Sequence, residues 1–425
     1  MLLEFRFENF RSFKGAAALS LLPVNSYKEC EDNVHRVDIP GTGTSGVLTA
    51  TAIYGGNASG KTNLLRAVHF SRSLVLGIEH PAHLARPQRF VGSDGPTRFG
   101  YTFYTAGTRF EYAFSIDEEG VLDEELRVRP KAERLVFRRE RAADGSYEVK
   151  QGSKYAGIKA RLRGYADGGL VLGLLASYGI APCAEAIDWF AKGLVVANRE
   201  QPTPDAAIIE KLATLDRERF ERVIRAISAA DLGIVGVQLD VDDMSEAEKA
   251  AQRESADKLA AVLEALTGQR PNGVETPDKK ATVQFRHVID GHGVGFGFDE
   301  ESLGTMTMLD LAIDFIGAID SGRTLFVDEV ERSLHPVLLE SLVGLFSDPA
   351  LNDKGAQLVF TTHDLSFLRN GRLRRDQIWF VEKDPQTGAS ETYPLSSFSP
   401  RKDESLVNRY LYGAYGAVPY IDGMA

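Results

Sequence analysis

The chain has 425 residues, enough for two or three domains or one large divided domain, and its formal net charge is −11. This negative charge argues against a protein that covers nucleic acid through non-specific binding. The only cysteines, Cys30 and Cys183, form no C-x-x-C pair, so neither a disulfide framework nor a cysteine zinc site is expected.

The amino terminus has the pattern of a strand. Met1-Leu2-Leu3-Glu4-Phe5-Arg6 alternates between apolar and polar residues and lacks the charged-then-apolar layout of a signal peptide. No stretch of the sequence approaches twenty uninterrupted apolar residues, so we expect no membrane span. These features together predict a cytoplasmic protein.

A phosphate-binding loop of the Walker A type follows the apolar run Leu48–Tyr54. The loop is Gly55-Gly56-Asn57-Ala58-Ser59-Gly60-Lys61-Thr62. We expect a strand to end at Tyr54 and a helix to begin near Lys61 and to include Asn63. The glycines let backbone N–H groups turn toward phosphate oxygens, and the helix points its positive end at the same charge. Lys61 can reach the β- and γ-phosphates of ATP, and the Thr62 hydroxyl can bind Mg²⁺.

The next segment gives one weak metal signal and then strands. Two histidines lie close together in Glu79-His80-x-x-His83, but Pro81 argues against the helix that a metalloprotease would need. Metal binding there is therefore not expected. Residues 97–104 and 110–116 alternate as strands, with turn residues between them.

Two basic clusters stand out against the negative net charge. The first holds seven basic residues between Arg127 and Arg141, opposed only by Glu133 and Glu140 within that segment. The second consists of Arg369, Arg372, Arg374 and Arg375. Such clusters can neutralise nucleic-acid phosphates, although more often they are solvated faces or partner contacts. Nucleic-acid contact therefore stays open.

The stretch between Lys61 and Asp328 is far longer than one crossover needs, so an insertion must divide the sheet. Residues 155–270 have a mostly helical pattern, with apolar spacings of three and four over 206–230 and 245–267. Strand-like segments return at 233–241 and 281–289. Heptads do not persist, which excludes a long coiled-coil arm and favours a compact helical lobe.

An acid pair of the Walker B type ends the apolar run Thr324–Val327. Buried parallel strands read as continuous apolar runs, and chemistry in open α/β sheets sits at the carboxyl ends of the strands. Asp328 would hold Mg²⁺, through water, and Glu329 would polarise the attacking water. The alternative is a strand that ends in two solvated acids.

A third apolar strand, beginning at Gln357, stops at Thr361-Thr362-His363-Asp364. A neutral imidazole at that place can donate to the γ-phosphate or to the attacking water. The alternative is a histidine that caps or packs against the strand end.

Four further segments carry a family resemblance. They are Glu8-Asn9-Phe10-Arg11-Ser12-Phe13-Lys14, Glu301-Ser302-Leu303-Gly304-Thr305, Glu331-Arg332-Ser333-Leu334-His335-Pro336 and residues 409–419. With the motifs above, they resemble the ABC-type ATPases of the SMC, RecF and OLD kind. The subgroup that they resemble most is the short bacterial ATPases of abortive-infection and anticodon-nuclease phage-defence systems. The signature reads Ser-Leu-Gly rather than the Leu-Ser-Gly-Gly of transporters, which argues against a transporter ATPase.

The resemblance implies an α/β fold of the ABC-type ATPase head. This fold has a mixed sheet with the phosphate loop, a flanking antiparallel sheet and, here, an inserted compact helical lobe. We expect a first ATPase lobe over residues 1–150, the helical insertion over 151–275, and a second ATPase lobe over 276–425. The second lobe would hold the signature, the acid pair and the histidine.

The resemblance also implies a shared site between two copies. The signature of one subunit closes on the γ-phosphate held by the other, so Ser302 and Gly304 would act in trans in a homodimer. The turn with Asn9, Arg11 and Ser12 would lie beside the nucleotide. The alternatives are that Ser302 only caps a helix and that Arg11 is a surface arginine at a turn. We expect Thr62 and Asp328 to bind Mg²⁺ and Glu329 and His363 to act in catalysis. The expected nucleotide-binding residues are Asn9, Arg11, Ser12, Gly55, Asn57, Ala58, Ser59, Gly60, Lys61, Thr62, Asn63, Ser302 and Gly304.

These features predict a slow ATPase that acts as a regulatory or sensor subunit of a bacterial phage-defence system. The chain ends about sixty residues after His363, which leaves no room for the nuclease domain of OLD-type proteins, so a separate effector, such as a nuclease, is expected. One alternative is a RecF-like DNA-repair ATPase. The other is a nucleotide-locked scaffold with negligible turnover.

Overall fold

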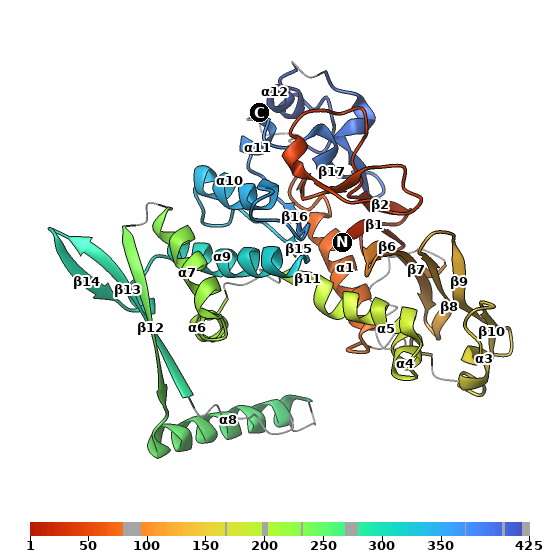
Figure 1. Cartoon of the computed structure of the whole chain (residues 1–425), viewed down its shortest axis with the longest axis horizontal. Coiled ribbons are helices and arrows are strands. Elements are labelled where there is room, and N and C mark those ends of the chain that lie inside the picture. The colour runs from red at the N-terminus through yellow and green to blue at the C-terminus, as the bar shows by residue number, and fades with distance from the viewer. Residues whose placement is uncertain are drawn as a thin grey trace. The chain divides into compact units, whose positions relative to one another are not determined.

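The computed structural model describes residues 1–79, 95–165, 168–197, 203–230, 233–267, 279–369, 371–401 and 404–418. The chain divides into two compact units (Figure 1). The first unit comprises Met1–Gln201 and Gly317–Ala425, and the second comprises Pro202–Ile316.

A six-stranded sheet forms the centre of the first unit. Its strands, in spatial order, are β11 (Leu194–Ala197), β15 (Thr324–Val327), β16 (Gln357–Thr361), β5 (Ala50–Tyr54), β17 (Ile378–Lys383) and β18 (Ser390–Pro394). The first five strands are parallel, and β18 is antiparallel to β17. Every residue of β5, β15 and β16 is buried, as the continuous apolar runs predicted. The three expected strands are therefore confirmed and lie side by side.

Several helices lie in the described part of the first unit. They are α1 (Lys61–Val75), α3 (Ile158–Arg161), α4 (Leu172–Ser177), α5 (Ala181–Asp188), α10 (Pro336–Gly344), α11 (Ser366–Arg369) and α12 (Leu406–Leu411). Helix α1 begins at Lys61, as expected, because Gly60 takes the left-handed conformation directly before it. Leu64, Leu65 and Val68 lie one turn or less apart and are buried in the main core of the unit.

The flanking antiparallel sheet is also present. Its spatial order is β10 (Tyr147–Gln151), β9 (Arg134–Arg141), β8 (Gly120–Arg129), β7 (Thr108–Asp117), β6 (Thr97–Thr105), β1 (Leu2–Glu8) and β2 (Ala17–Ser20). The inner face is aromatic: Phe103 stacks on Trp189 with ring centroids 4.0 Å apart, and Tyr101 meets Phe190 edge to face. A small two-stranded sheet pairs β3 (Val34–Arg36) with β4 (Gly46–Leu48).

A buried ion pair joins this sheet to the start of α4. Glu124 of β8 is fully buried, and Nε of Arg139 on β9 donates to its carboxylate at 2.9 Å. The same carboxylate accepts from the Tyr112 hydroxyl and from the backbone N–H groups of Val171 and Leu172. Four donors thus compensate the burial of one negative charge.

The second unit contains both helices and strands. It holds α6 (Asp205–Ala213), α7 (Arg217–Ser228), α8 (Glu246–Thr267) and the start of α9 (Leu303–Ser321), with a three-stranded antiparallel sheet of β12 (Ile234–Asp243), β13 (Lys279–Ile289) and β14 (His292–Phe296). Helix α8 lies at the far end of the ribbon formed by β12 and β13 (Figure 1). The helical pattern over 245–267 and the strand-like segments at 233–241 and 281–289 are confirmed. The stretch 206–230 is two helices, because Asp216 accepts from the Arg219 N–H and starts a new one.

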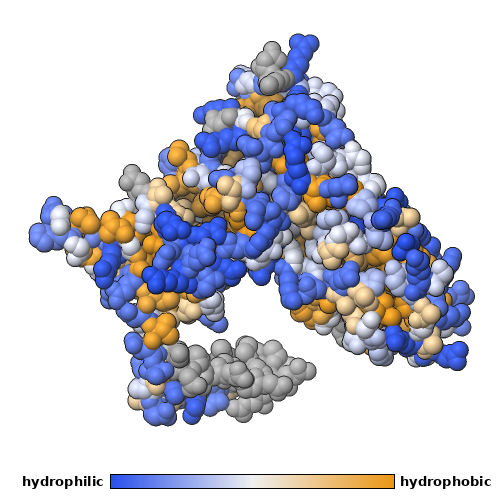
Figure 2. Space-filling view, viewed as in Figure 1, coloured by the Kyte–Doolittle hydropathy of each residue, from blue (hydrophilic) through white to orange (hydrophobic). Residues whose placement is uncertain are grey.

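The sheet of the second unit has a buried and an exposed side. Ile234, Val283 and Phe285 pack into a core with α6, α7 and α9. In contrast, hydrophobic residues are exposed along the sheet (Figure 2), among them Val235, Val288, Ile289 and Val294. Within the described ranges, no helix combines the length and the apolar character that crossing a membrane requires.

Candidate nucleotide-binding site

The phosphate loop, residues 55–62, connects β5 to α1 in a conformation that only its glycines allow. A Cβ atom on Gly55 would collide with the backbone carbonyl of Val381, and one on Gly60 would lie 2.5 Å from the Ser390 hydroxyl. Gly60 has φ 117° and Ala58 has φ 59°, both in the left-handed region. Asn57 and Ala58 are exposed at the tip, whereas Ser59 is buried, and its hydroxyl has no hydrogen-bond partner among the described residues.

Lys61 is folded back onto its own loop. Its ammonium group donates to the carbonyl oxygens of Gly55 (2.8 Å) and Gly56 (3.2 Å) and lies 3.2 Å from Nε2 of His363. The side chain is buried, and burial lowers the pKa of Lys61, while the charges of Asp328, Glu329 and Glu331 oppose that shift. A buried cation held mainly by neutral acceptors is well placed to bind an anionic phosphate.

Asp328 lies between two threonine hydroxyls. Thr62 donates to one carboxylate oxygen at 2.7 Å, and Thr361, at the end of β16, donates to the other at 2.5 Å. The Thr361 hydroxyl also accepts the backbone N–H of Glu329 at 2.7 Å. The expected Mg²⁺ ligands, Thr62 and Asp328, are therefore in direct contact, and one buried threonine orients the acid pair.

Glu329 itself is exposed and has φ 46°, a left-handed conformation that turns the chain sharply after β15. Strained backbone of this kind occurs at functional sites. The carboxylate is thus accessible to the water that it would polarise.

His363 faces Lys61 at the same sheet edge. Because a lysine ammonium only donates, Nε2 of His363 accepts in this contact. Burial lowers the pKa of His363, the positive charge of Lys61 lowers it further, and three nearby carboxylates oppose the shift. The ring is therefore neutral at pH 7. The His363 backbone N–H donates to Oε1 of Glu331 at 2.6 Å.

These groups fit ATP with Mg²⁺. The Asp328 carboxylate and the Thr62 hydroxyl are oxygen ligands of the kind that Mg²⁺ prefers. The loop leaves no room for side chains at Gly55 and Gly60. The Ser59 hydroxyl is buried beside them and has no hydrogen-bond partner among the described residues. Helix α1 begins at Lys61, so its positive end can stabilise a phosphate bound at the loop.

The turn after β1 reaches the phosphate loop through Ser12. Its hydroxyl accepts from the Asn63 side chain at 2.9 Å and bonds to the Ser390 hydroxyl at 2.8 Å. Ser390, at the start of β18, also donates to the Ser59 carbonyl at 2.6 Å. The turn after β1 and the start of β18 therefore support the phosphate loop and the start of α1 through hydrogen bonds.

The other two residues of that turn have different contacts. Asn9 is buried; its side-chain amide donates to the Gly95 carbonyl at 2.9 Å, and its backbone carbonyl accepts from the Thr97 hydroxyl. Arg11 is half-buried, with its guanidinium carbon 5.8 Å from the centre of the Phe10 ring. Their place beside the nucleotide stays a prediction.

Ser302 and Gly304 lie in the second unit, where α9 begins. The Ser302 hydroxyl accepts the Thr305 N–H at 3.1 Å and so caps the helix. Helix α9 starts at Leu303. Leu303 is 54% exposed, so the signature presents a surface to solvent. Directly before it, Glu301 pairs with His287 of β13 at 2.5 Å.

Sequence reasoning missed three residues of this site. The sequence gives Thr361 no role of its own, although its place at the end of an apolar run like those before the phosphate loop and the acid pair is an available signal. Glu331 appeared only as part of a motif. Ser390 gave no signal, because a serine that begins a strand is common.

The two basic clusters are largely neutralised by acids. On β8 and β9, Arg127 pairs with Glu125 and Glu133, Arg138 with Glu140, and Arg141 with Asp117. In the second cluster, the pairs are Arg372 with Glu340, Arg374 with Asp376 and Arg375 with Glu29. These pairs weaken both clusters as nucleic-acid surfaces. His80 and His83 lie outside the described residues.

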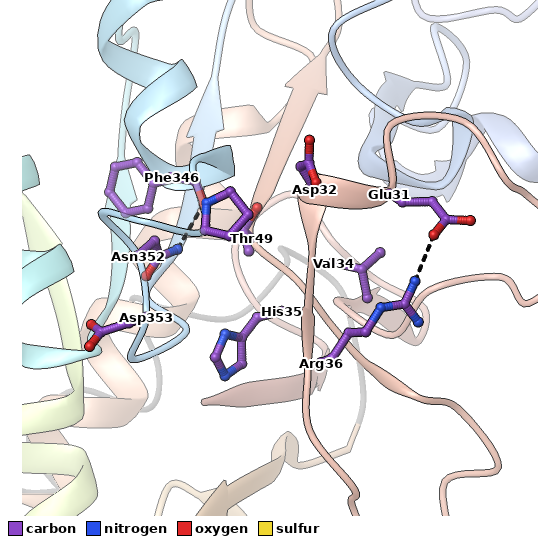
Figure 3. A pocket seen from close by; sticks show the side chains of 10 residues that line it. Glu31, Asp32, Val34, His35, Arg36, Thr49, Phe346, Asn352 and Asp353 are labelled. Carbon is purple, nitrogen blue, oxygen red and sulfur yellow. Dashed lines mark hydrogen bonds and ion pairs between the residues drawn. The ribbon is translucent and has the colours of Figure 1, made fainter.

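A pocket of about 460 Å³ lies elsewhere on the first unit. Its lining includes Thr49, which precedes β5, and Asn352, which precedes β16, so it is at the sheet edge opposite the phosphate loop. His35 and Asp353 border it, and Glu31 pairs with Arg36 at its rim (Figure 3). The nucleotide chemistry described above does not involve this pocket.

The chain was compared with known families, proteins and structures. A family model described as "AAA domain, putative AbiEii toxin, Type IV TA system" matches residues 50–369, more than half of the chain. No curated protein matches the chain. A crystal structure of the SmcHead bound to the C-winged helix domain of ScpA is similar over 94% of this chain and 99% of that chain, with 13% identity and a TM-score of 0.41. The chain therefore belongs to this AAA-domain family.

Proposed function

We propose that the chain binds ATP with Mg²⁺ at the phosphate loop and hydrolyses it slowly, as a regulatory or sensor subunit that acts with a separate effector in a bacterial phage-defence system. The observation that carries the ATPase part is the convergence of four groups from three parallel strands: Lys61 and Thr62 after β5, Asp328 after β15, and His363 after β16. The family description, with its toxin–antitoxin system, supports the defence context.

Each residue has a distinct part in hydrolysis. Lys61 leaves the carbonyls of Gly55 and Gly56 and binds the β- and γ-phosphates. Thr62 and Asp328 would hold Mg²⁺, which would supply positive charge next to the phosphate oxygens. Glu329 accepts a proton as water attacks the γ-phosphorus, and the bond to the β–γ bridging oxygen breaks, which leaves ADP and phosphate. Neutral His363 hydrogen-bonds to the γ-phosphate or to the water.

The same proposal includes an ATP-dependent homodimer. The sequence holds one copy of each motif, so two composite sites need two chains. Ser302 and Gly304 would close on the γ-phosphate of the partner copy. The exposure of Leu303 between them supports a signature that is presented to another surface.

Mixing two inactive variants tests this arrangement. A Lys61→Ala chain and a Ser302→Arg chain should each be inactive. If the signature acts in trans, the mixed dimer keeps one intact site, so activity should return on mixing, up to about one quarter of the wild-type rate, because half of the dimers are mixed. No recovery on mixing, together with a monomer by light scattering in every nucleotide state, would rule the dimer out.

The effector would dock on parts that ATP chemistry does not use. The insertion between about 155 and 275 and the Arg127–Arg141 cluster are the proposed surfaces, and the exposed Val235 supports the former. A pull-down from the native host, with ATP and a cytoplasmic extract, should recover an effector such as a nuclease. Tight ATP-dependent binding to gapped or end DNA without a partner would favour RecF-like repair instead. Normal ATP affinity with negligible turnover would favour the scaffold.

A further inference from the structure

Glu331 links the acid-pair loop to the histidine loop. Its Oε1 accepts the backbone N–H of His363 at 2.6 Å. The other oxygen, Oε2, is buried and has no hydrogen-bond partner within the described part of the chain. The negative charge of Glu331 acts on both Lys61 and His363, which places the carboxylate beside the phosphate site. Neither the acid-pair chemistry nor the Mg²⁺ site uses this residue.

Other hydrogen bonds also hold this loop. The Val330 N–H donates to the Thr361 carbonyl at 3.2 Å, and the Glu329 N–H donates to the Thr361 hydroxyl. The Leu334 N–H donates to the Glu331 carbonyl at 2.9 Å. These backbone bonds and the pairing of β15 with β16 fix the strand ends. Among the described residues, the Glu331 side chain adds to this framework the N–H of His363, which lies beyond the end of β16.

We propose that Glu331 is a positioning residue for ATP hydrolysis: its carboxylate fixes the backbone of His363 and so holds the imidazole at the γ-phosphate. This inference rests on the proposed ATPase function. Displacement of a catalytic group by about 1 Å can cost on the order of a hundredfold in rate. A glutamine keeps a carbonyl oxygen at the same reach and can accept the same N–H, whereas an alanine cannot.

The test combines four variants with three measurements. Glu331→Ala, Glu331→Gln, His363→Ala and the Glu331→Ala/His363→Ala double variant are compared with the wild type and with Glu148→Ala, which removes an exposed glutamate of β10. Steady-state hydrolysis gives kcat, and ATP affinity is measured separately. Hydrogen–deuterium exchange of the His363 amide reports the contact directly and does not depend on hydrolysis.

The expected pattern is specific to positioning. Glu331→Ala should lower kcat on the order of 10- to 100-fold and leave ATP affinity within about twofold. Glu331→Gln should keep most of the rate. The double variant should be no slower than His363→Ala, because Glu331 acts through the histidine. Exchange at the His363 amide should be slow in the wild type and in Glu331→Gln and fast in Glu331→Ala.

Three results would overturn the inference: an unchanged rate in Glu331→Ala, losses that multiply in the double variant, or equal amide exchange in Glu331→Ala and the wild type. A Glu331→Gln variant as slow as Glu331→Ala would also overturn it, because charge rather than the hydrogen bond would then matter. A wild type that protects the His363 amide but hydrolyses no ATP contradicts the proposed function instead. The two failures are thus distinguishable.

Discussion

The Thr62 hydroxyl donates to the Asp328 carboxylate at 2.7 Å, which joins two residues 266 positions apart in the sequence. The contact exists because β5 and β15 flank β16 in one parallel sheet, so the loops after all three strands meet at the same edge. The two residues that are expected to bind Mg²⁺ are thus in direct contact. Thr361 completes the arrangement from the strand between them.

Replacing Thr361 by valine should impair the metal site. The change keeps the shape of the side chain but removes the donor to Asp328 and the acceptor for the Glu329 N–H. Loss of such a supporting contact typically costs 10- to 100-fold, so we expect about a tenfold higher Mg²⁺ requirement for hydrolysis. Mg²⁺ titrations of the rate measure this.

Thr51→Val is the matched control for that change. Thr51 is equally buried on neighbouring β5, but its hydroxyl has no hydrogen-bond partner among the residues that the structure describes. Valine should therefore be tolerated there, with the Mg²⁺ requirement unchanged. If the hydrolysis rate depends on Mg²⁺ concentration in the same way for Thr361→Val and the wild type, Thr361 does not orient Asp328.

Lys61→Ala should abolish ATP binding. The lysine is the cation of the phosphate loop, and it is already buried against Gly55, Gly56 and His363. Equilibrium binding of a fluorescent ATP analogue measures the effect. Lys150→Ala, at an exposed position of β10, should bind normally. Wild-type affinity in a folded Lys61→Ala protein would show that ATP binds elsewhere.

Stability should depend on pH through His363. The folded protein lowers the pKa of this histidine below its ordinary value of 6.5, so the unfolded chain binds the proton more readily. The stabilisation that results is complete above pH 6.5 and is lost as the pH falls through the folded pKa. Thermal midpoints from pH 8 to 5 should therefore fall more steeply for the wild type than for His363→Gln. Parallel curves would contradict the assignment.

The buried Arg139–Glu124 pair should matter for stability but not for nucleotide binding. Arg139→Met leaves the Glu124 charge buried with three neutral donors, and breaking such a pair costs about 3–5 kcal/mol. The neighbouring Arg138→Met removes an exposed pair and should cost under about 1 kcal/mol. Urea unfolding compares the two variants, and equal losses would contradict the role of burial.

The sequence alone predicts the parts of the site that depend on the order of the strands. The phosphate loop, Asp328, Glu329 and His363 each end an apolar run, and the carboxyl ends of parallel strands meet at one edge. The sequence alone therefore predicts that these residues lie in one site. Their catalytic roles are still predictions that the experiments above address.

Side-chain contacts across the fold could not be predicted in the same way. Ser390 supports Ser59 from 331 residues away, and nothing local in either segment indicates this. Asn9 is bound to the Gly95 carbonyl, a contact that depends on how β1 pairs with β6. Two acids that neutralise the Arg127–Arg141 cluster lie outside that segment: Glu125 precedes Arg127 by two residues on β8, and Asp117 ends β7.

The central claim is that Glu329 polarises water for ATP hydrolysis at this site. The direct measurement is the hydrolysis rate of Glu329→Gln beside its ATP affinity, with Glu148→Gln as the control on exposed β10. Because Thr62, Asp328 and Lys61 are intact, ATP should bind normally, while the rate should fall at least on the order of a hundredfold. Hydrolysis at the wild-type rate by a folded, ATP-binding Glu329→Gln protein would contradict the claim.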